Sequence, residues 1–147
     1  MAFTGSSVCF SFLAEMWQAV HNFSSNGDVF KLALYTPDAT LSANTSVYSS
    51  TNEISAAGYT AGGAVLPTTL GVASGGPISF PQFLPVVFGV TITARGGLIY
   101  NHTKGDRAVC VLDFGMSLTS NNFTVTPPAN GPESALLRVA GTLGSWT

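Results

Sequence analysis

The sequence has 147 residues, of which 46% are hydrophobic and 8% are charged. Soluble domains usually carry about 25% charged residues. Apolar residues this abundant, with so few charges, exclude a disordered chain. Five basic residues against seven acidic residues give no cationic surface, so we expect no nucleic-acid partner.

The length predicts one domain, residues 1–147, with a helix at 8–23 and a β-rich body at 28–143. The longest apolar stretch, residues 83–94, is broken by Pro85, so we expect no membrane partner. Residues 8–14 are apolar like the core of a secretory signal, but no basic residue precedes them and Glu15 ends them. We therefore interpret the chain as cytoplasmic at synthesis.

The low charge has two explanations. The chain could be a β protein whose exposed strand faces carry serine and threonine. It could instead work inside a larger assembly, because the centres of protein interfaces are depleted in lysine, glutamate and aspartate. Composition does not decide between the two.

Residues 8–23 are predicted to form a helix, because apolar side chains recur there at three- and four-residue spacing. These are Phe12, Met16, Ala19, Val20 and Phe23, with Leu13 flanking the same stripe. A polar stretch that includes Gly27 then ends the helix. The apolar stripe must be covered either by the protein's own sheet or by a neighbouring subunit.

After Gly27 the apolar period changes from 3.6 to 2, which indicates strands. The clearest are residues 30–35 and 86–95. Shorter strands are predicted at residues 59–66, 68–73, 98–100, 108–114, 123–126 and 135–143, with a hairpin loop at 101–107. Short strands separated by glycine and proline turns predict a mainly β, jelly-roll-like domain with one N-terminal helix, either a sandwich or a barrel.

The sequence offers little to catalysis. His21 and His102 are far apart, and we expect each to be a surface imidazole, His21 at the helix end. Asp113-Phe114-Gly115 spells part of a kinase signature but stands alone, so it is interpreted as the end of a strand and a turn. We predict no enzyme, no catalytic residue and no cofactor.

The two cysteines, Cys9 and Cys110, lack the short C-x-x-C spacing of a metal site, so no metal is predicted. Their neighbours in the sequence are apolar, and no export signal is evident. Two buried free thiols are therefore favoured over a disulfide.

The aromatic residues, Trp17 among them, are spread through the chain without interleaved basic residues, and most of them are expected in the core. Trp146 is the candidate partner-binding residue, as an anchor on another protein. The alternative, that Trp146 packs back on its own domain, stays open.

Three segments resemble a family of small tailed-phage and prophage proteins: residues 30–36 (FKLALYT), 51–55 (TNEIS) and 58–66 (GYTAGGAVL). That family shows a K-x-A-L-Y strand, a T-N-E-V segment and a G-Y-T-A-G-G loop in the same order. Residues 92–95, 98–100 and 112–115 (LDFG) fit its second half, so the resemblance covers residues 30–115. It implies a virion structural protein and carries over no catalytic residue. Its glycines and Asn52-Glu53 look like determinants of the fold.

The resemblance and the composition together predict a capsid decoration or cement protein, made in the host cytoplasm and located in the virion. Its expected partner is the major capsid protein, at the joints between subunits, and we expect self-association, as a trimer. A tail, neck or baseplate component is the alternative within the particle. A carbohydrate-binding adsorption module is the alternative from another class.

Overall fold

The computed structural model describes residues 3–67 and 71–141. The elements in chain order are β1 (Ser7–Val8), α1 (Phe10–Trp17), β2 (Phe30–Tyr35), β3 (Ala64–Leu66), β4 (Val72–Gly75), β5 (Ile78–Pro81), β6 (Val86–Val87), β7 (Ile92–Asn101), β8 (Arg107–Ser120), β9 (Thr124–Val125) and β10 (Val139–Ala140). The protein is therefore mainly β, with one short helix near its N-terminus, as the sequence predicts.

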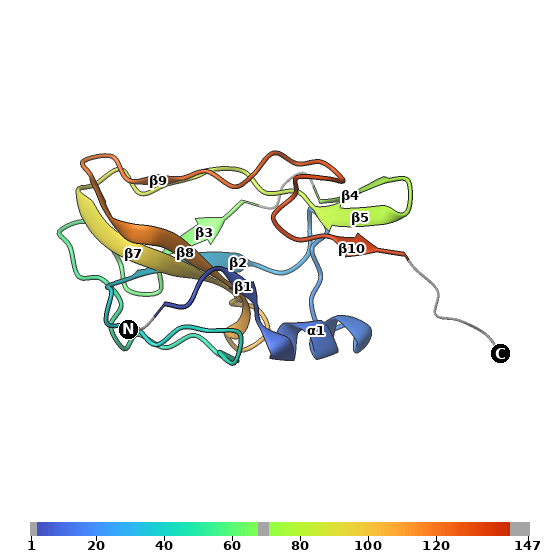
Figure 1. The fold of residues 1–147 in the computed structure, drawn as a ribbon, viewed down its shortest axis with the longest axis horizontal. Coiled ribbons are helices and arrows are strands. Elements are labelled where there is room, and N and C mark those ends of the chain that lie inside the picture. The colour runs from blue at the N-terminus through green and yellow to red at the C-terminus, as the bar shows by residue number, and fades with distance from the viewer. Residues whose placement is uncertain (1–2, 68–70, 142–147) are drawn as a thin grey trace.

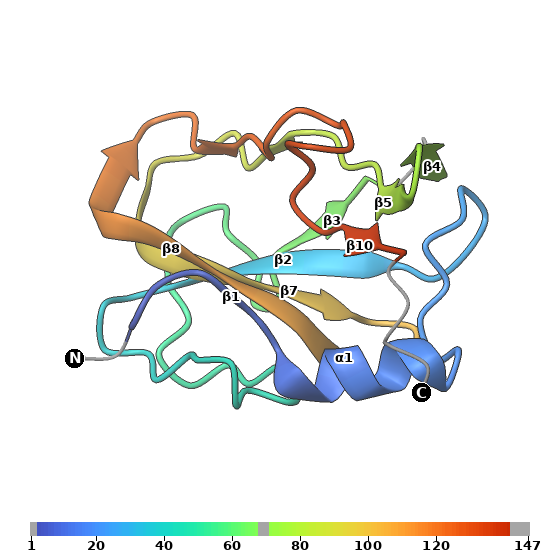
Figure 2. The same cartoon turned by 45° about the vertical axis from the view of Figure 1, so that its right-hand side comes forward.

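The strands form three antiparallel sheets that pack as a sandwich-like fold. The largest has the order β1-β8-β7-β2-β3, and the smaller ones have the orders β10-β5-β4 and β6-β9. In Figure 1 the two small sheets lie above the large sheet, while α1 and the long loop after β2 lie below it, and Figure 2 shows the same layers from another side.

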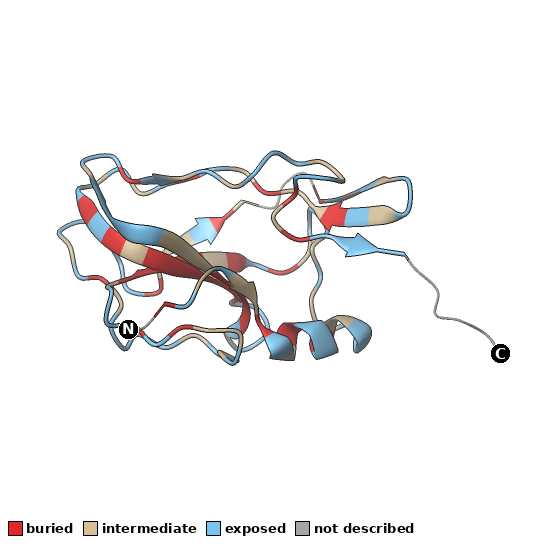
Figure 3. Cartoon of the chain, in the orientation of Figure 1, coloured by how far each residue is buried: buried red, intermediate tan, exposed pale blue. Residues whose placement is uncertain are grey.

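The core lies on both faces of β2, β7 and β8, which are the most buried strands (Figure 3). The β2–β7 register pairs Leu32 with Ile99, and both line a cavity of about 230 Å³ under β9. The next pair, Lys31 and Tyr100, faces the opposite side, where the Tyr100 hydroxyl donates a hydrogen bond to a loop carbonyl. Alternate side chains of one strand thus hold two different layers.

The helix is shorter than the predicted 8–23, because it ends at Trp17. Ala19 adopts the left-handed conformation, with φ of 55°. Its N–H bonds to the Met16 carbonyl, and the Val20 N–H bonds to the Glu15 carbonyl. This pair of bonds is a Schellman motif, a helix end that usually carries glycine. With alanine at this position, the sequence gives no sign of the end before Gly27.

The predicted strand 86–95 is wrong as one unit, since it divides into β6 and the start of β7 in different sheets. Gly89 between them has φ of 69°, which extended backbone does not allow. The Phe88 N–H bonds to the Phe123 carbonyl, and the chain then crosses to the large sheet. The alternating pattern continues through this crossing, because both parts face the same core.

The remaining strands follow the prediction in part. β2 matches it fully, the loop between β7 and β8 covers residues 102–106, and β3, β4, β9 and β10 are shorter or shifted. The predicted strand 98–100 is the end of β7. Residues 68–70 and 142–143 of two predicted strands lie outside the described residues. No helix in the described part of the chain has the length and apolar character needed to cross a bilayer.

Candidate interaction surface

The two histidines have different environments, and the prediction for His21 is wrong. The His21 side chain is 1% exposed and lies after the helix, packed against the rings of Phe12 and Phe30. The prediction failed because the helix ends early, and the chain after Ala19 turns back to the sheet. His102 is a surface imidazole as predicted, 55% exposed and 2.7 Å from Asp106.

His21 belongs to a buried polar network. Its Nε2 is 2.7 Å from Oε2 of Glu15, and its Nδ1 is 2.9 Å from Nδ2 of Asn101, a residue with no exposed surface. The same Nδ2 donates to Asp28, while Oδ1 of Asn101 accepts from the Lys104 N–H. These bonds fix the Asn101 amide, so His21 accepts at Nδ1 and donates from Nε2 to Glu15.

The network connects distant parts of the chain. Glu15 of α1 accepts at its other oxygen from Arg107 of β8, over 2.6 Å. Lys104 lies 3.8 Å from Asp28. Every member has a partner, as buried polar groups require, and the two ring nitrogens of His21 bond to Glu15 and Asn101.

The cysteines are free and buried, as predicted. Burial, with a smaller contribution from Glu15, raises the pKa of Cys9 to about 11. Burial also raises the pKa of Cys110, and the nearby Cys9 adds to it. Thiols held protonated in this way are poor nucleophiles. In residues 3–67 and 71–141, no cluster of three or more His, Cys, Asp or Glu side chains could hold a metal ion.

Asp113-Phe114-Gly115 lies inside β8 and not at its end, so that prediction is wrong. Gly115 has φ of 80°, and its N–H bonds to the Asp113 carboxylate. The β7–β8 register shifts here, which makes this segment a bulge. Asp113 also pairs with Arg95 of β7.

The segments TNE and GYTAGG are joined by one hydrogen-bonded network next to β2, which we call the Glu53 network. Glu53 accepts from the hydroxyls of Tyr48 and Tyr59, both at 2.6 Å, and from the Gly62 N–H at 2.7 Å. Asn52 adopts a left-handed conformation at the turn before it. Burial raises the pKa of both tyrosines, and the Glu53 carboxylate raises it further. These contacts give the two segments a physical role in the fold.

Gly63 shows why this loop needs glycine. Its φ is 75°, and a Cβ there would overlap the Leu32 carbonyl oxygen of β2. The loop therefore runs directly against the strand.

All four tyrosines of the chain direct their hydroxyls to internal acceptors, with Tyr35 bound to Ser49 and Tyr100 to Gly62.

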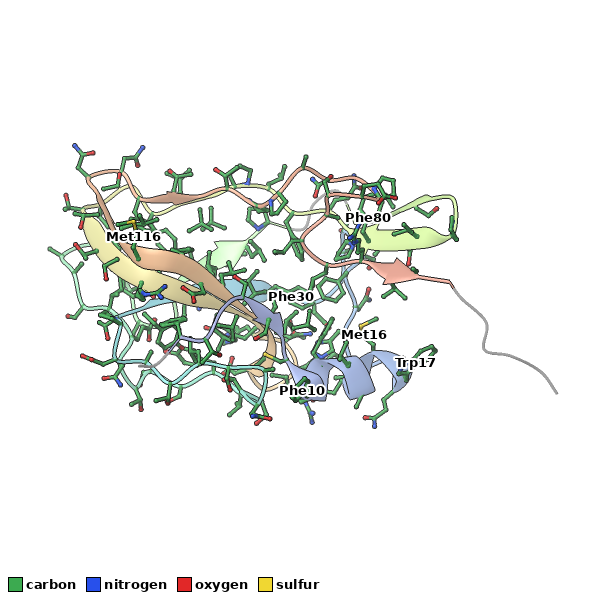
Figure 4. All side chains as sticks on the ribbon, viewed as in Figure 1. Phe10, Met16, Trp17, Phe30, Phe80 and Met116 are labelled. Atoms are coloured by element: carbon green, nitrogen blue, oxygen red, sulfur yellow. The ribbon has the colours of Figure 1, made fainter. Side chains whose placement is uncertain are left out.

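The outer face of α1, formed by Phe10, Leu13 and Trp17, is apolar and exposed. The exposed fractions are 60%, 48% and 91%. The spacing i, i+3, i+7 places the three on one side of the helix. Figure 4 shows Phe10 and Trp17 on the outer side of α1, whereas Met16 points toward the layer that holds Phe80. Trp17 is therefore an exception to the expectation that most aromatic residues lie in the core.

The outer face of α1 carries no charge. The one charged residue of α1 is Glu15, which is buried and paired inside the protein. The same spacing could be read from the sequence, because α1 is apolar on both sides. A single buried stripe was the simpler interpretation, and it hid the second one.

A groove adjoins this face. We call it the α1–β5 groove, and it has a volume of about 380 Å³. Leu13 and Met16 of α1 line one side. The other side is lined by the sheet β10-β5-β4 and the segment before β10, through Val72, Phe80, Leu137, Arg138 and Val139. Val72 and Val139 are exposed at its edge. Leu13 belongs to both surfaces, so the outer face of α1 and the groove form one apolar region.

Trp146, the residue singled out as an anchor, lies outside the described residues. Comparisons with protein-family models, with curated proteins and with solved structures found no match to this chain.

Proposed function

We propose that this chain is a structural protein of a phage particle, a capsid decoration or cement protein that attaches to the major capsid protein through the outer face of α1. The observation that carries the proposal is the exposure of Trp17, 91%, on a helix face without charge. Tryptophan dominates binding at many protein interfaces, and interface centres are poor in charged residues. The resemblance of residues 30–115 to tailed-phage proteins is the reason for proposing a phage particle.

The low charge of the whole chain supports the same proposal. Net charge is −2, and an uncharged helix face costs little to remove from water. Among the described residues, both ring nitrogens of His21 are taken up by Glu15 and Asn101, so the proposal contains no catalysis. The carbohydrate-binding alternative has less support, because the four tyrosine hydroxyls bond inside the protein and form no exposed platform.

The first experiment counts copies of this chain per particle, in virions whose genome encodes it, by quantitative mass spectrometry against the major capsid protein. A ratio near one to one, or another fraction compatible with the lattice, supports the decoration role. A small number of copies contradicts that role and favours the tail, neck or baseplate. Absence from the particle overturns the virion proposal.

The second experiment tests the surface. Particles that lack this chain are titrated with the purified wild-type protein and with Trp17→Ser. Loss of an interface hot spot weakens binding by about thirtyfold, which corresponds to about 2 kcal/mol. Val87→Ser is the matched control, because Val87 is 58% exposed on β6, away from α1. Equal affinity of both variants would show that α1 is not the contact. Sedimentation of the free protein tests the expected trimer.

A further inference from the structure

We propose that the cavity of about 230 Å³ under β9 binds a small, neutral aromatic molecule that carries a hydroxyl group, of the size of a substituted phenol. We call it the β9 cavity. The inference goes beyond the proposed function, since it concerns a small ligand. In Figure 1, β9 and α1 lie on opposite sides of the large sheet, so this ligand does not compete with a partner bound to α1.

The wall that the large sheet gives to the β9 cavity is apolar and fully buried. Leu32, Leu66 and Ile99 line it, with exposed fractions of 0%, 2% and 1%. Leu32 and Ile99 are register partners on neighbouring strands, so their side chains lie side by side on the same face. A space with such a wall favours the apolar body of a ligand over water.

The volume sets the size of the ligand. Protein interiors hold few voids larger than a water molecule, because an empty cavity reduces stability. An apolar cavity of about 150 Å³ can hold benzene, whereas pockets for drug-sized ligands begin at about 300 Å³. The β9 cavity lies between these sizes, which suits one aromatic ring with one or two small substituents.

The side opposite the sheet is stiff and suits a ring. Pro127 and Pro128, which follow β9, line the cavity there. Proline fixes its own φ and lacks an N–H donor, so this segment resists collapse onto the sheet and keeps the cavity open. Phe114 of β8 also lines the cavity, and aromatic rings pack well against one another in offset or edge-on arrangements.

Three polar residues complete the lining, namely Ser6, Asp113 and Thr126. The Asp113 N–H donates to Ser6 Oγ over 2.9 Å, which leaves the Ser6 hydroxyl proton for another acceptor. Thr126 supplies a second hydroxyl. Ser6 and Thr126 are exposed, whereas Leu32, Leu66 and Ile99 are buried, so the polar part of the lining adjoins solvent. This is the usual pattern of a small-molecule site, an apolar enclosure with a few polar groups that orient the ligand.

The charges at the cavity favour a neutral ligand. Asp113 is the one charged residue of the lining, and its carboxylate pairs with Arg95 of β7 and accepts from the Gly115 N–H. Since the carboxylate is already neutralised, a cationic ligand would lose hydration without gaining a free partner. A hydroxyl group can both donate to and accept from the polar lining at less cost.

The test titrates the isotope-labelled full chain with p-cresol, toluene and benzylammonium, followed by NMR. We expect saturable shifts of the Leu66 and Val125 amides, which belong to the lining. The Kd of p-cresol should be about fivefold lower than that of toluene, the gain from one hydrogen bond. Shifts that do not saturate with any probe would overturn the proposal. Equal affinity for toluene contradicts the hydroxyl group, and tighter binding of benzylammonium contradicts a neutral ligand.

A matched pair of substitutions locates the site. Val125→Trp fills the β9 cavity from β9. Val87→Trp is its control, because Val87 lies on β6, the strand paired with β9, and is 58% exposed. Circular dichroism checks the fold of both variants. We expect Val125→Trp to weaken both p-cresol and toluene more than tenfold and Val87→Trp to leave both unchanged. Unchanged binding in Val125→Trp would show that the probes bind elsewhere.

A second variant tests the polar lining and does not depend on a core substitution. The double variant Ser6→Ala, Thr126→Val removes two hydroxyls from exposed residues. We expect it to abolish the fivefold preference for p-cresol over toluene, while the Kd of toluene stays the same. A preference that survives in this variant would overturn the assignment of the hydroxyl group to these two residues.

Discussion

The Nε2 atom of His21 donates a hydrogen bond to Oε2 of Glu15 over 2.7 Å, in a site where both side chains are hidden from water. The other Glu15 oxygen accepts from Arg107, so one carboxylate joins α1 to the turn after it and to β8. The orientation of the helix, and with it the exposure of Trp17, depends on this carboxylate.

Replacement of His21 should therefore destabilise the protein. His21→Ala removes a ring packed on Phe12 and takes one buried hydrogen bond each from Glu15 and Asn101. We expect the free energy of unfolding to fall by about 2–4 kcal/mol. Urea denaturation followed by circular dichroism measures it. His102→Ala is the control and should change stability by less than about 0.5 kcal/mol, because His102 is exposed. Similar losses of stability in both variants would contradict a stabilising role for the buried hydrogen bonds of His21.

The Glu53 network gives a second prediction. Glu53→Ala leaves the Tyr48 and Tyr59 hydroxyls and the Gly62 N–H without their acceptor. The expected loss of stability is about 2–4 kcal/mol, with faster hydrogen exchange at the Gly62 amide. Glu133→Ala serves as the control, because the Glu133 side chain is 84% exposed. Unchanged exchange at Gly62 in Glu53→Ala would show that the loop is held by other contacts.

Two glycines allow the energetic cost of backbone strain to be distinguished from the cost of close packing. Gly63 and Gly76 both have positive φ, 75° and 61°, but an added Cβ meets the Leu32 carbonyl at Gly63 and nothing within 4 Å at Gly76. Gly76→Ala should cost about 1–2 kcal/mol, from the conformation alone. Gly63→Ala should cost at least about 3 kcal/mol or prevent folding, because backbone must also move. Thermal unfolding of the two variants compares them directly, and equal costs would refute the close approach of loop and strand.

Alkaline pH should destabilise the protein. The folded state raises the pKa of Cys9 from 9.0 to about 11, chiefly through burial. Above about pH 9 the unfolded chain releases this proton while the native protein keeps it, so the free energy of unfolding falls as pH rises toward 11. The raised pKa of Tyr35, again chiefly through burial, extends the loss above about pH 10. Urea denaturation at a series of pH values checks this.

The cysteine contribution can be isolated. The double variant Cys9→Ala, Cys110→Ala should show a smaller slope of stability against pH between about pH 8.5 and 9.5, where tyrosines titrate little. Below that range both proteins should show the same slope. A wild-type stability that stays constant up to about pH 10 would contradict the burial of the thiols.

The sequence predicts those parts of the fold whose signals are local. Phe30–Tyr35 alternates apolar residues between two turn signals, and β2 has these bounds. The end of α1 could not be predicted, because Ala19 takes a left-handed conformation that the sequence marks elsewhere with glycine. The split at Gly89 was missed because alternation continues through it. The prediction for His21 failed because the helix ends at Trp17 and the chain after Ala19 returns to the core.

The residues that hold α1 also bear on how the chain folds. Glu15 meets one partner 6 residues away and another 92 residues away. An isolated helix of eight residues is unstable in water, so α1 gains its stability from contacts that exist only after β8 is in place. We therefore expect the β7–β8 hairpin to form early and α1 to dock late, which makes folding slow for a chain of this length. A ribosome that has released only the first half of the protein would hold α1 as unfolded chain.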